Sequence, residues 1–478
     1  MAYDAVNGAS KVEPLSPSVS RLTPFDILEA VSTLSRPFML SGGRYSYVGA
    51  EPFAVLTVGA DETTLKWSDG RSTEKFTEAP FKLLSNLLEG FSLGDAPPFP
   101  FSSGGVGYFS YDLKGLMEDE GFTPSTKEHL GDGAALSRLP LLSIGFYNNI
   151  YVYDHEVGAA YLVETNLGKA SAPSSLFRET VLTATPEAEP ANIDRNEGDR
   201  YSSSISEAGY ISAIKKALEY ISEGDIYQIN ISRRLSFPLK EKPTKIYRRI
   251  KEAAPSRFAY YMDMEGFQVI ANTPERFIKV KDRKVKTEPI KGTRPRRVSK
   301  AKDKSVVEEL HSNIKEAAEH LMIVDLERSD MGRISKTASV KVDDFKRIET
   351  YPNLHHMVST ITGELKDGLS SIDALSQVFP GGSITGTPKV RAMELIDELE
   401  AEPRGLYTGT LGWMDFGSGN IDMAMSIRTA ICVDDLIHLS VGSGIVADSD
   451  PKAEYMETTT KAEDFLNTLG LKSKATGD

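Results

Sequence analysis

Two short runs of β-forming residues, separated by a polar turn, predict a β-hairpin in the second half of this chain. The three segments are Phe277 to Val280, Asp282-Arg283-Lys284 and Val285 to Glu288. Pro289 then stops the strand pattern, because proline has no backbone N–H for a sheet, and Gly292 frees the backbone. We therefore expect Lys291 at a corner between a strand and a loop, where scaffolds of this kind place working groups.

A carboxylic acid lies at the other end of the same hairpin. Glu275 closely precedes the first run, and the hairpin is short enough to bring Glu275 and Lys291 side by side. A lysine in a partly dry corner beside such an acid can act as an amine nucleophile next to a proton donor. The alternative interpretation is an ordinary cross-strand ion pair.

Composition restricts the class of protein. The 478 residues are 40% hydrophobic, which is enough for two or three domains with sizeable cores. A net charge of −13 repels phosphate backbones, so we expect no nucleic-acid partner. The single cysteine, Cys432, excludes a disulfide framework and lies in an apolar run typical of a core. No apolar run reaches membrane-spanning length and no signal core is evident, so we expect a cytoplasmic protein without membrane contacts.

The order of patterns along the chain predicts an α+β fold. Residues 1–20 are polar and predict a flexible lead-in, and residues 21–185 alternate short β-type runs with Gly and Pro, typical of a β-rich domain. An acidic, Pro- and Ser-bearing stretch at 186–205 predicts a linker. The remaining domain, 206–470, opens with a helix that Gly224 ends. No glycine-rich nucleotide-binding loop follows a strand.

Two pairs of glutamates have helical spacing. Glu316 and Glu319 share one face of a long helix predicted from about Lys302 to Leu326, and Glu454 and Glu457 begin a helix near the C-terminus. The core stripe expected on the first helix is Ile314, Ala317, Ala318 and Leu321. Four converging carboxylates would repel one another unless a cation lay between them, and an all-oxygen set suits Mg²⁺. Solvent-exposed glutamates are the alternative.

Several segments of the last third are suited to binding an anion. A Gly-rich loop, Gly381 to Lys389, runs into a predicted helix whose start Thr385 or Thr387 could cap, leaving N–H groups for a ligand. Arg428 ends a β-type run among apolar neighbours and needs an acidic partner or a carboxylate ligand. Gly442-Ser443-Gly444, expected after a strand, could bring backbone amides close to it. His356, expected in a loop beside His355, is a candidate proton carrier.

Taken together, these segments resemble the chorismate-utilising enzymes, and within them the aminodeoxychorismate synthase component I group. The resemblance covers nearly all of residues 205–470 in the family order. The matching runs are Gly224 to Gln228, Thr273 to Phe277, Pro289 to Arg294, Ala318 to Leu326, Tyr351 to His356, Gly381 to Lys389 and Gly442 to Glu457. The first part matches more weakly, chiefly through Ser41 to Ser46. The resemblance implies antiparallel β-sheets packed face to face, with helices on the outside.

The resemblance also implies a reaction and a role for each residue. Ammonia from a separate glutamine amidotransferase subunit would replace the C4 hydroxyl of chorismate and give 4-amino-4-deoxychorismate, for 4-aminobenzoate and folate synthesis. Lys291 would add to the ring, Glu275 would protonate the departing hydroxyl, and His356 would lie near the reacting edge. Mg²⁺ would bind Glu319 and Glu457 directly, and Glu316 and Glu454 through water. The substrate would contact Gly292, Thr293, Thr385, Tyr407, Arg428, Gly442, Ser443 and Gly444.

Two positions separate this activity from those of sister enzymes. Relatives that form anthranilate carry alanine where this chain has Lys291, and relatives that add water carry lysine where it has Gln228. Anthranilate synthase component I is the main alternative, and a catalytically silent chorismate- or tryptophan-binding regulator is another. Tryptophan-regulated relatives carry a Leu-Leu-Glu-Ser run where this chain has Phe38-Met39-Leu40-Ser41. Only Ser41 therefore marks a possible tryptophan site.

Overall fold

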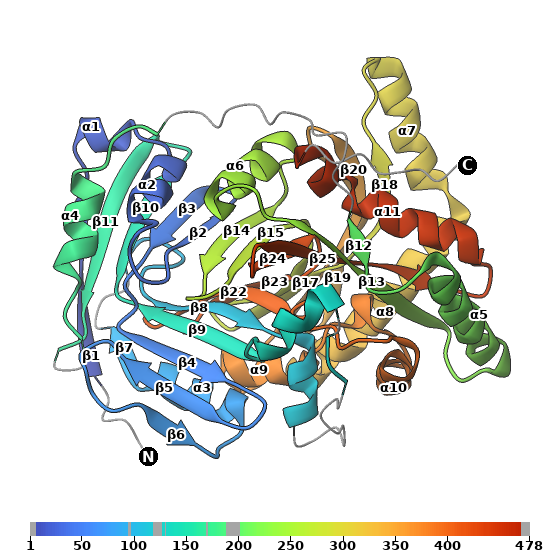
Figure 1. The fold of residues 1–478 in the computed structure, drawn as a ribbon, viewed down its shortest axis with the longest axis horizontal. Helices are drawn as coiled ribbons and strands as arrows, with labels where there is room; N and C mark the ends of the chain where they lie inside the picture. Colours follow the sequence, from blue (N-terminus) through green and yellow to red (C-terminus); the bar gives the residue numbers. More distant parts are fainter. Residues whose placement is uncertain are drawn as a thin grey trace.

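The computed structural model describes residues 6–93, 97–117, 127–129, 131–168, 171–187 and 201–469. Within these residues the chain folds into two large β-sheets stacked face to face, with helices on both outer faces (Figure 1). Apart from one parallel pair, β1 with β7, neighbouring strands run antiparallel. The predicted α+β class with face-to-face antiparallel sheets is confirmed.

Sheet one holds thirteen strands within the described residues. The order along the sheet is β12 (Ser202–Ser203), β13 (Gln228–Pro238), β25 (Leu436–Ile445), β24 (Thr429–Val433), β15 (Gln268–Thr273), β14 (Phe258–Asp263), β2 (Phe38–Gly42), β3 (Tyr45–Gly49), β10 (Asn149–Asp154), β11 (Ala159–Asn166), β1 (Val6–Pro14) and β7 (Phe91–Leu93). The short strand β21 (Gly386–Thr387) pairs with the start of β13.

Sheet two holds twelve strands within the described residues. The order is β18 (Ile290–Pro295), β20 (Leu354–Glu364), β17 (Lys284–Glu288), β16 (Arg276–Lys281), β23 (Ile421–Met425), β22 (Thr410–Asp415), β8 (Gly104–Phe109), β9 (Leu142–Tyr147), β4 (Ala54–Val58), β5 (Thr63–Trp67) and β6 (Glu74–Phe76). The strand β19 (Lys341–Thr350) pairs with β20.

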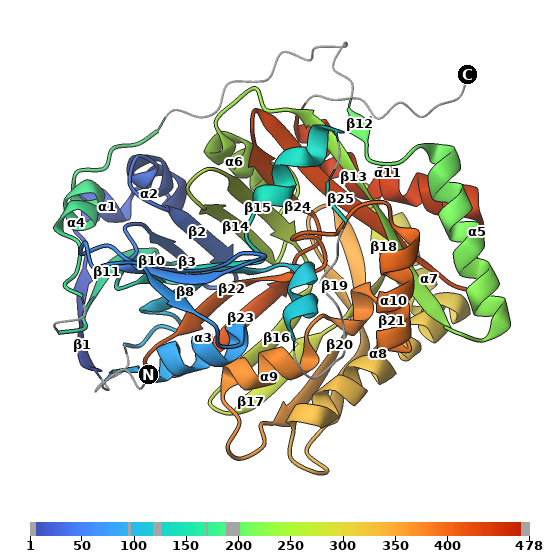
Figure 2. The ribbon, with the colours of Figure 1, turned by 60° about the horizontal axis from the view of Figure 1, so that its bottom comes forward.

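Apolar side chains divide the helices between the two outer faces. Sheet one is covered by α2 (Pro24–Val31), α4 (Ser175–Leu182), α6 (Pro243–Ala253) and α11 (Pro451–Thr468). Sheet two is covered by α3 (Pro80–Glu89), α8 (Ile314–Ile334) and α9 (Ser371–Val378), and Figure 2 shows α8 and α9 on that face. The helices α5 (Glu207–Glu223) and α10 (Lys389–Leu399) pack on the end of β13. The remaining helices are α1 (Pro17–Ser20) and α7 (Lys300–Ser312), with short 3₁₀ turns η1 (Tyr111–Leu116), η2 (Gly131–Arg138) and η3 (Gly382–Ile384).

The two parts of the chain share both sheets. In sheet one β14 pairs with β2, and in sheet two β22 pairs with β8, so strands from before and after the predicted linker lie side by side. The core between the sheets likewise mixes residues such as Phe38 and Tyr260. Most of the predicted linker lies outside the described residues, and the proposed domain boundaries stay a prediction.

The flexible lead-in expected at residues 1–20 is wrong for the described part. Residues Val6–Pro14 form β1, which pairs with β11 at the edge of sheet one, and α1 follows. Residues Val6–Pro14 are ordered by their backbone hydrogen bonds to β11. Their polar composition alone did not predict a strand. In the described residues no helix has the length and apolar character required to cross a bilayer.

Candidate active site

The predicted hairpin is present. Strands β16 and β17 pair antiparallel around a turn in which Asp282 and Arg283 have φ angles of 51° and 61°. These left-handed angles match the right-handed twist of the flanking strands, as in a two-residue hairpin turn. The hairpin lies in sheet two between β20 and β23.

Lys291 lies inside a strand, so the expected strand-to-loop corner is wrong. After Pro289 the chain resumes as β18, which pairs with β20, and the register shifts between Ile290 and Thr293. Gly292, with φ of 83°, lies in this irregularity, and a Cβ there would fall 3.0 Å from Glu316 Oε2 on α8. Glycine therefore permits both the left-handed backbone and the close approach of a carboxylate.

The partner of Lys291 is not the one expected from the hairpin. Its Nζ lies 2.7 Å from Glu319 Oε2 on α8, and the side chain is 22% exposed. The alternative of a Lys291–Glu275 ion pair is therefore wrong, because β18 turns Lys291 toward α8. Gly444 lies on the other side of this amine, since a Cβ on Gly444 would be 3.8 Å from Nζ and 3.6 Å from Gln228 Nε2.

Glu275 is buried, 5% exposed, just before β16. Its Oε1 accepts a 2.6 Å hydrogen bond from the Ser383 hydroxyl of η3. Burial raises the pKa of Glu275, the Ser383 hydrogen bond opposes this and the negative charge of Glu327 adds to it, so that the pKa is about 8. A carboxyl group in this setting holds its proton at neutral pH and can donate it, as a general acid must.

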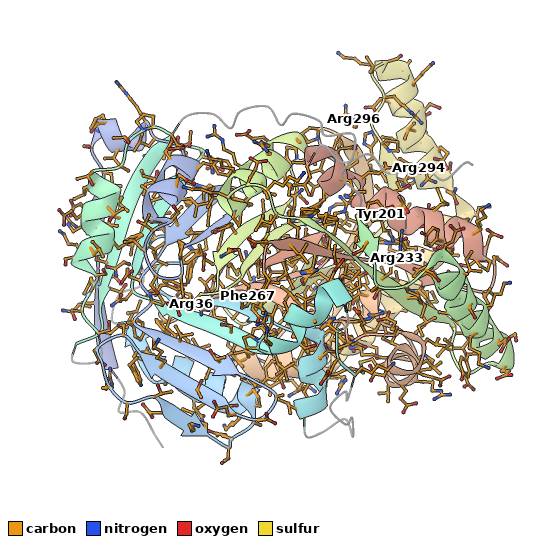
Figure 3. All side chains as sticks on the ribbon, viewed as in Figure 1. Arg36, Tyr201, Arg233, Phe267, Arg294 and Arg296 are labelled. Atoms are coloured by element: carbon orange, nitrogen blue, oxygen red, sulfur yellow. The ribbon has the colours of Figure 1, made fainter. Side chains whose placement is uncertain are left out.

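Each of the four predicted metal-binding glutamates contacts another side chain. Glu319 contacts Lys291, Glu316 lies 3.0 Å from Arg294 (labelled in Figure 3), and Glu457 lies 2.8 Å from Lys461. Glu454 accepts a short hydrogen bond from Ser443. Burial alone would raise the pKa of Glu457, but Lys461 and Lys291 outweigh that effect and lower it. Lys291 therefore lies in the field of glutamates from both helices.

These residues fit Mg²⁺ in chemistry, although their side chains do not form a preassembled cage. The donors are carboxylate oxygens, which this hard cation prefers. In the described part of the chain, no three His, Cys, Asp or Glu side chains lie close enough together to hold a metal ion. Lys291, Arg294 and Lys461 supply the positive charge instead, so a metal ion would have to replace some of these contacts.

The core stripe predicted for the helix of Glu316 and Glu319 is wrong. The chain breaks at Asn313 into α7 and α8, Ile314 is 86% exposed and Leu321 is 48% exposed. The side chains that face sheet two are instead His320, Ile323, Val324, Glu327, Met331 and Ile334. The stripe is displaced because α8 packs on sheet two mainly through its second half, which leaves the first two turns at the rim.

The glycines expected after a strand lie within β25. Gly442 pairs with Ser232, and a Cβ on it would lie 2.6 Å from both Asn230 Oδ1 and the Tyr407 hydroxyl. The side chain of Ser443 reaches Glu454, and the Gly442 carbonyl accepts a 2.9 Å hydrogen bond from Lys461. This part of β25 therefore connects the buried Tyr407 to the carboxylates of α11.

His356 lies in β20 and not in a loop, because residues 354–364 pair with both β18 and β19. Its Nδ1 is 2.8 Å from the Thr293 hydroxyl. Burial and the nearby Arg428 guanidinium lower the pKa of His356 to about 3. The imidazole is thus neutral at physiological pH, which favours a hydrogen-bonding role over that of a proton carrier.

The Gly-rich loop does not cap α10 with a threonine. Pro388 is at the N-cap without a side-chain hydrogen bond, and the buried Thr385 hydroxyl donates to the carbonyls of Gly381 and Gly382. The predicted capping role is wrong because these contacts fold the loop back on itself. The loop instead turns Ser383 toward Glu275.

Sequence reasoning missed Ser383, Glu327 and Lys461. Ser383 lies inside a matching segment and Lys461 lies just past one, but only the fold shows that Ser383 reaches Glu275 and that Lys461 reaches Glu457. Glu327 directly follows the largely apolar run at 321–326, and this position was the sequence signal that it could be buried. The structure shows that it is buried.

Ser41 lies apart from these residues. It belongs to β2, four strands from β25 in the order of sheet one. Its hydroxyl is 2.9 Å from Ser46 Oγ and accepts a 2.5 Å hydrogen bond from Lys251 Nζ. The possible tryptophan site therefore stays a prediction. In this structure the Ser41 hydroxyl is hydrogen-bonded to Lys251.

Comparison with known proteins agrees with this arrangement. Residues 37–467 match the chorismate binding enzyme family. Aminodeoxychorismate synthase component 1 of Bacillus subtilis is 34% identical over 91% of each chain, and anthranilate synthase component 1 of Acetivibrio thermocellus is 34% identical over 94% of this chain and 92% of its own. The crystal structure of anthranilate synthase component I from Streptococcus pneumoniae superposes with a TM-score of 0.77 at 28% identity, covering 88% of this chain and 92% of that one. The chain is a member of the chorismate binding enzyme family.

Proposed function

We propose that this chain aminates chorismate at C4 and releases 4-amino-4-deoxychorismate. The observation that supports the proposal is the position of Lys291, whose amine lies 2.7 Å from Glu319 Oε2 and 3.8 Å from where a Cβ on Gly444 would be. Overall identity is the same, 34%, for the two kinds of synthase, so it does not separate them. Lys291 does, because relatives that form anthranilate carry alanine there.

The proposed reaction uses Lys291 and Glu275 in turn. The Lys291 nitrogen forms a bond to C2 after its contact with Glu319 opens and the amine has lost its proton. The ring double bonds shift, the C4–O bond breaks, and Glu275 gives its proton to the hydroxyl, which leaves as water. Ammonia then forms a bond to C4 and loses a proton, the double bonds shift back, and the C2–N bond to Lys291 breaks.

The other predicted residues would hold the substrate. Arg428 is suited to a carboxylate of chorismate, and Gly442 and Gly444, which have no side chains, would let the main chain approach the ligand. Thr293 and His356 would lie at the ring edge, joined by the hydrogen bond between them. The main chain at Gly292 and the buried Thr385 would shape the remaining wall.

Mg²⁺ is the proposed cofactor. Glu319 and Glu457 would hold it directly, with Glu316 and Glu454 behind them. Bound there, the ion would neutralise the ring carboxylate of chorismate and withdraw electron density from the diene. When Glu319 binds the ion, its contact with Lys291 would open, and the Lys291 amine would become available to the ring.

The ammonia is proposed to come from a separate glutamine amidotransferase subunit. Nothing in this sequence resembles a glutaminase, and Cys432 is fully buried, with a thiol pKa that burial raises to about 12. Such a thiol is unsuited to the cysteine chemistry that releases ammonia from glutamine.

The product of the purified chain tests the proposal. Chorismate, Mg²⁺ and an ammonium salt at alkaline pH are incubated with and without a 4-amino-4-deoxychorismate lyase, and products are read by mass and fluorescence. We expect 4-aminobenzoate only when the lyase is present. Fluorescent 2-aminobenzoate without the lyase would assign the chain to anthranilate synthesis instead. No product in either case would point to an obligatory partner subunit or to a binding role.

A further inference from the structure

A second carboxyl group lies behind Glu275, and one residue contacts both. The Ser383 hydroxyl donates to Glu275 Oε1 at 2.6 Å, while the backbone N–H of Ser383 donates to the Glu327 carboxyl group. Gly382 presses against the same helix, since a Cβ on it would lie 2.7 Å from Leu326 and 3.4 Å from Glu327 Oε1. The start of η3, Gly382 and Ser383, therefore lies between the Glu275 and Glu327 carboxyl groups.

Glu327 has little to compensate a negative charge. It is 5% exposed, and its Oε2 accepts a 3.2 Å hydrogen bond from the Thr287 hydroxyl. Lys389 of α10, whose charge acts on Glu327, lies 2.5 Å from Asp330 and also donates to the Val378 carbonyl. Lys389 is thus largely committed to Asp330, one turn further along α8.

These surroundings make the two acids interdependent. Burial and the Asp330 charge raise the pKa of Glu327, and Lys389 opposes them, so that the pKa is about 7. The Glu327 charge in turn raises the pKa of Glu275. Two carboxyl groups in one dry pocket resist losing both protons.

We propose that Glu327 is a positioning residue for the acid: through Ser383 it holds the Glu275 carboxyl group in place, and through its own charge it keeps that group protonated. This inference rests on the proposed role of Glu275 as proton donor. Glu327 need not touch the substrate, because its effect reaches the ring through Glu275.

Glu327→Gln and Ser383→Ala provide opposed tests. Glutamine keeps the size of Glu327 but removes its charge, so the alkaline limb of kcat against pH should move to lower pH by roughly one pH unit. Alanine at Ser383 removes a hydrogen bond that stabilises ionised Glu275, so the limb should move to higher pH. Glu327→Asp should restore the wild-type limb at least in part.

Asp112→Asn is the matched control. Asp112 is also a buried acid, with a pKa that burial raises to about 6, but it bonds the Gly405 backbone N–H away from Glu275. Its removal should leave the alkaline limb in place. An unmoved limb in Glu327→Gln, with the protein folded by circular dichroism, would overturn the inference.

A direct titration separates this inference from the proposed function. Infrared spectra of the protein without chorismate, with Glu275→Gln identifying the band, follow protonation of the Glu275 carboxyl group. A lower midpoint in Glu327→Gln supports the inference even if chorismate is not aminated. The same midpoint in wild type and Glu327→Gln would overturn it even if amination is observed.

Discussion

Two regions of α8 differ in how the charge of nearby glutamates is balanced: the start of the helix, with Glu316 and Glu319, and its second half, where Glu327 lies near Glu275. At the start of the helix, Glu316 and Glu319 are 22% and 17% exposed and each contacts a cation. In the second half, Glu327 is buried, and its neighbour Glu275 accepts a hydrogen bond from the Ser383 hydroxyl. The same residue type is therefore paired with lysine or arginine at the rim, whereas burial raises its pKa inside.

The difference shows how one fold assigns two jobs to glutamate. Lys291 and Arg294 pair with the rim carboxylates, whose oxygens are the ligands that a hard metal ion prefers. Burial without a committed cation raises the pKa of the inner pair, as donating a proton requires. Replacing individual residues in each region can test whether this division is real.

Lys291→Ala should have the largest effect, because it removes the proposed nucleophile from the rim region. We expect C4 amination to fall by about a thousandfold or more. The fold should persist, since the lysine is on the rim. Single-turnover product formation measures the loss, and Lys284→Ala, an exposed lysine of the same hairpin, is the control. Unchanged turnover would remove Lys291 from the mechanism.

Glu275→Gln should have the next largest effect, because it removes the proton donor from the inner region. We expect kcat to fall by roughly a hundredfold or more. In the wild type, kcat should decline above about pH 8, where Glu275 loses its proton, and this limb should be absent in the variant. A variant that keeps the limb would assign it to another group.

Glu457→Gln should have a smaller effect that is confined to the metal. We expect the Mg²⁺ concentration for half-maximal rate to rise about 10- to 100-fold. Calorimetric Mg²⁺ titration checks the binding directly, and Glu463→Gln, on the exposed side of α11, is the matched control. Activity in Glu457→Gln without added metal would show that the metal assignment is wrong.

The smallest expected effect is on the free energy of unfolding, which should be higher for Glu275→Gln than for the wild type. Folded Glu275 keeps its proton to about pH 8, whereas the unfolded chain loses it near pH 4.5. Between these values the unfolded state binds fewer protons, so wild-type stability falls as pH rises. Glu275→Gln lacks this penalty and should be more stable by about 4 kcal/mol at pH 8 but not at pH 4. Urea unfolding at both pH values measures it, and equal differences at both would contradict the burial account.

Local patterns predicted the elements near the site well. The hairpin around Asp282, the helix that ends at Gly224 and the buried Cys432 depend on turn residues, a left-handed glycine and an apolar run. Local patterns did not predict strands whose pairing partners in the two large sheets lie far away in the sequence. His356 and Gly442 read as loop residues, but both lie in strands whose partners are far away in the chain.

The sequence by itself determined which chemical groups are available and, through the matching segments, the family to which the chain belongs. Only the tertiary structure decided their partners. Lys291 pairs with Glu319 rather than Glu275 because β18 joins β20 and faces α8. Ser383 connects Glu275 and Glu327 because η3 packs between them. Such contacts depend on the order of strands and on which side of each helix is buried, and no short window of sequence specifies either.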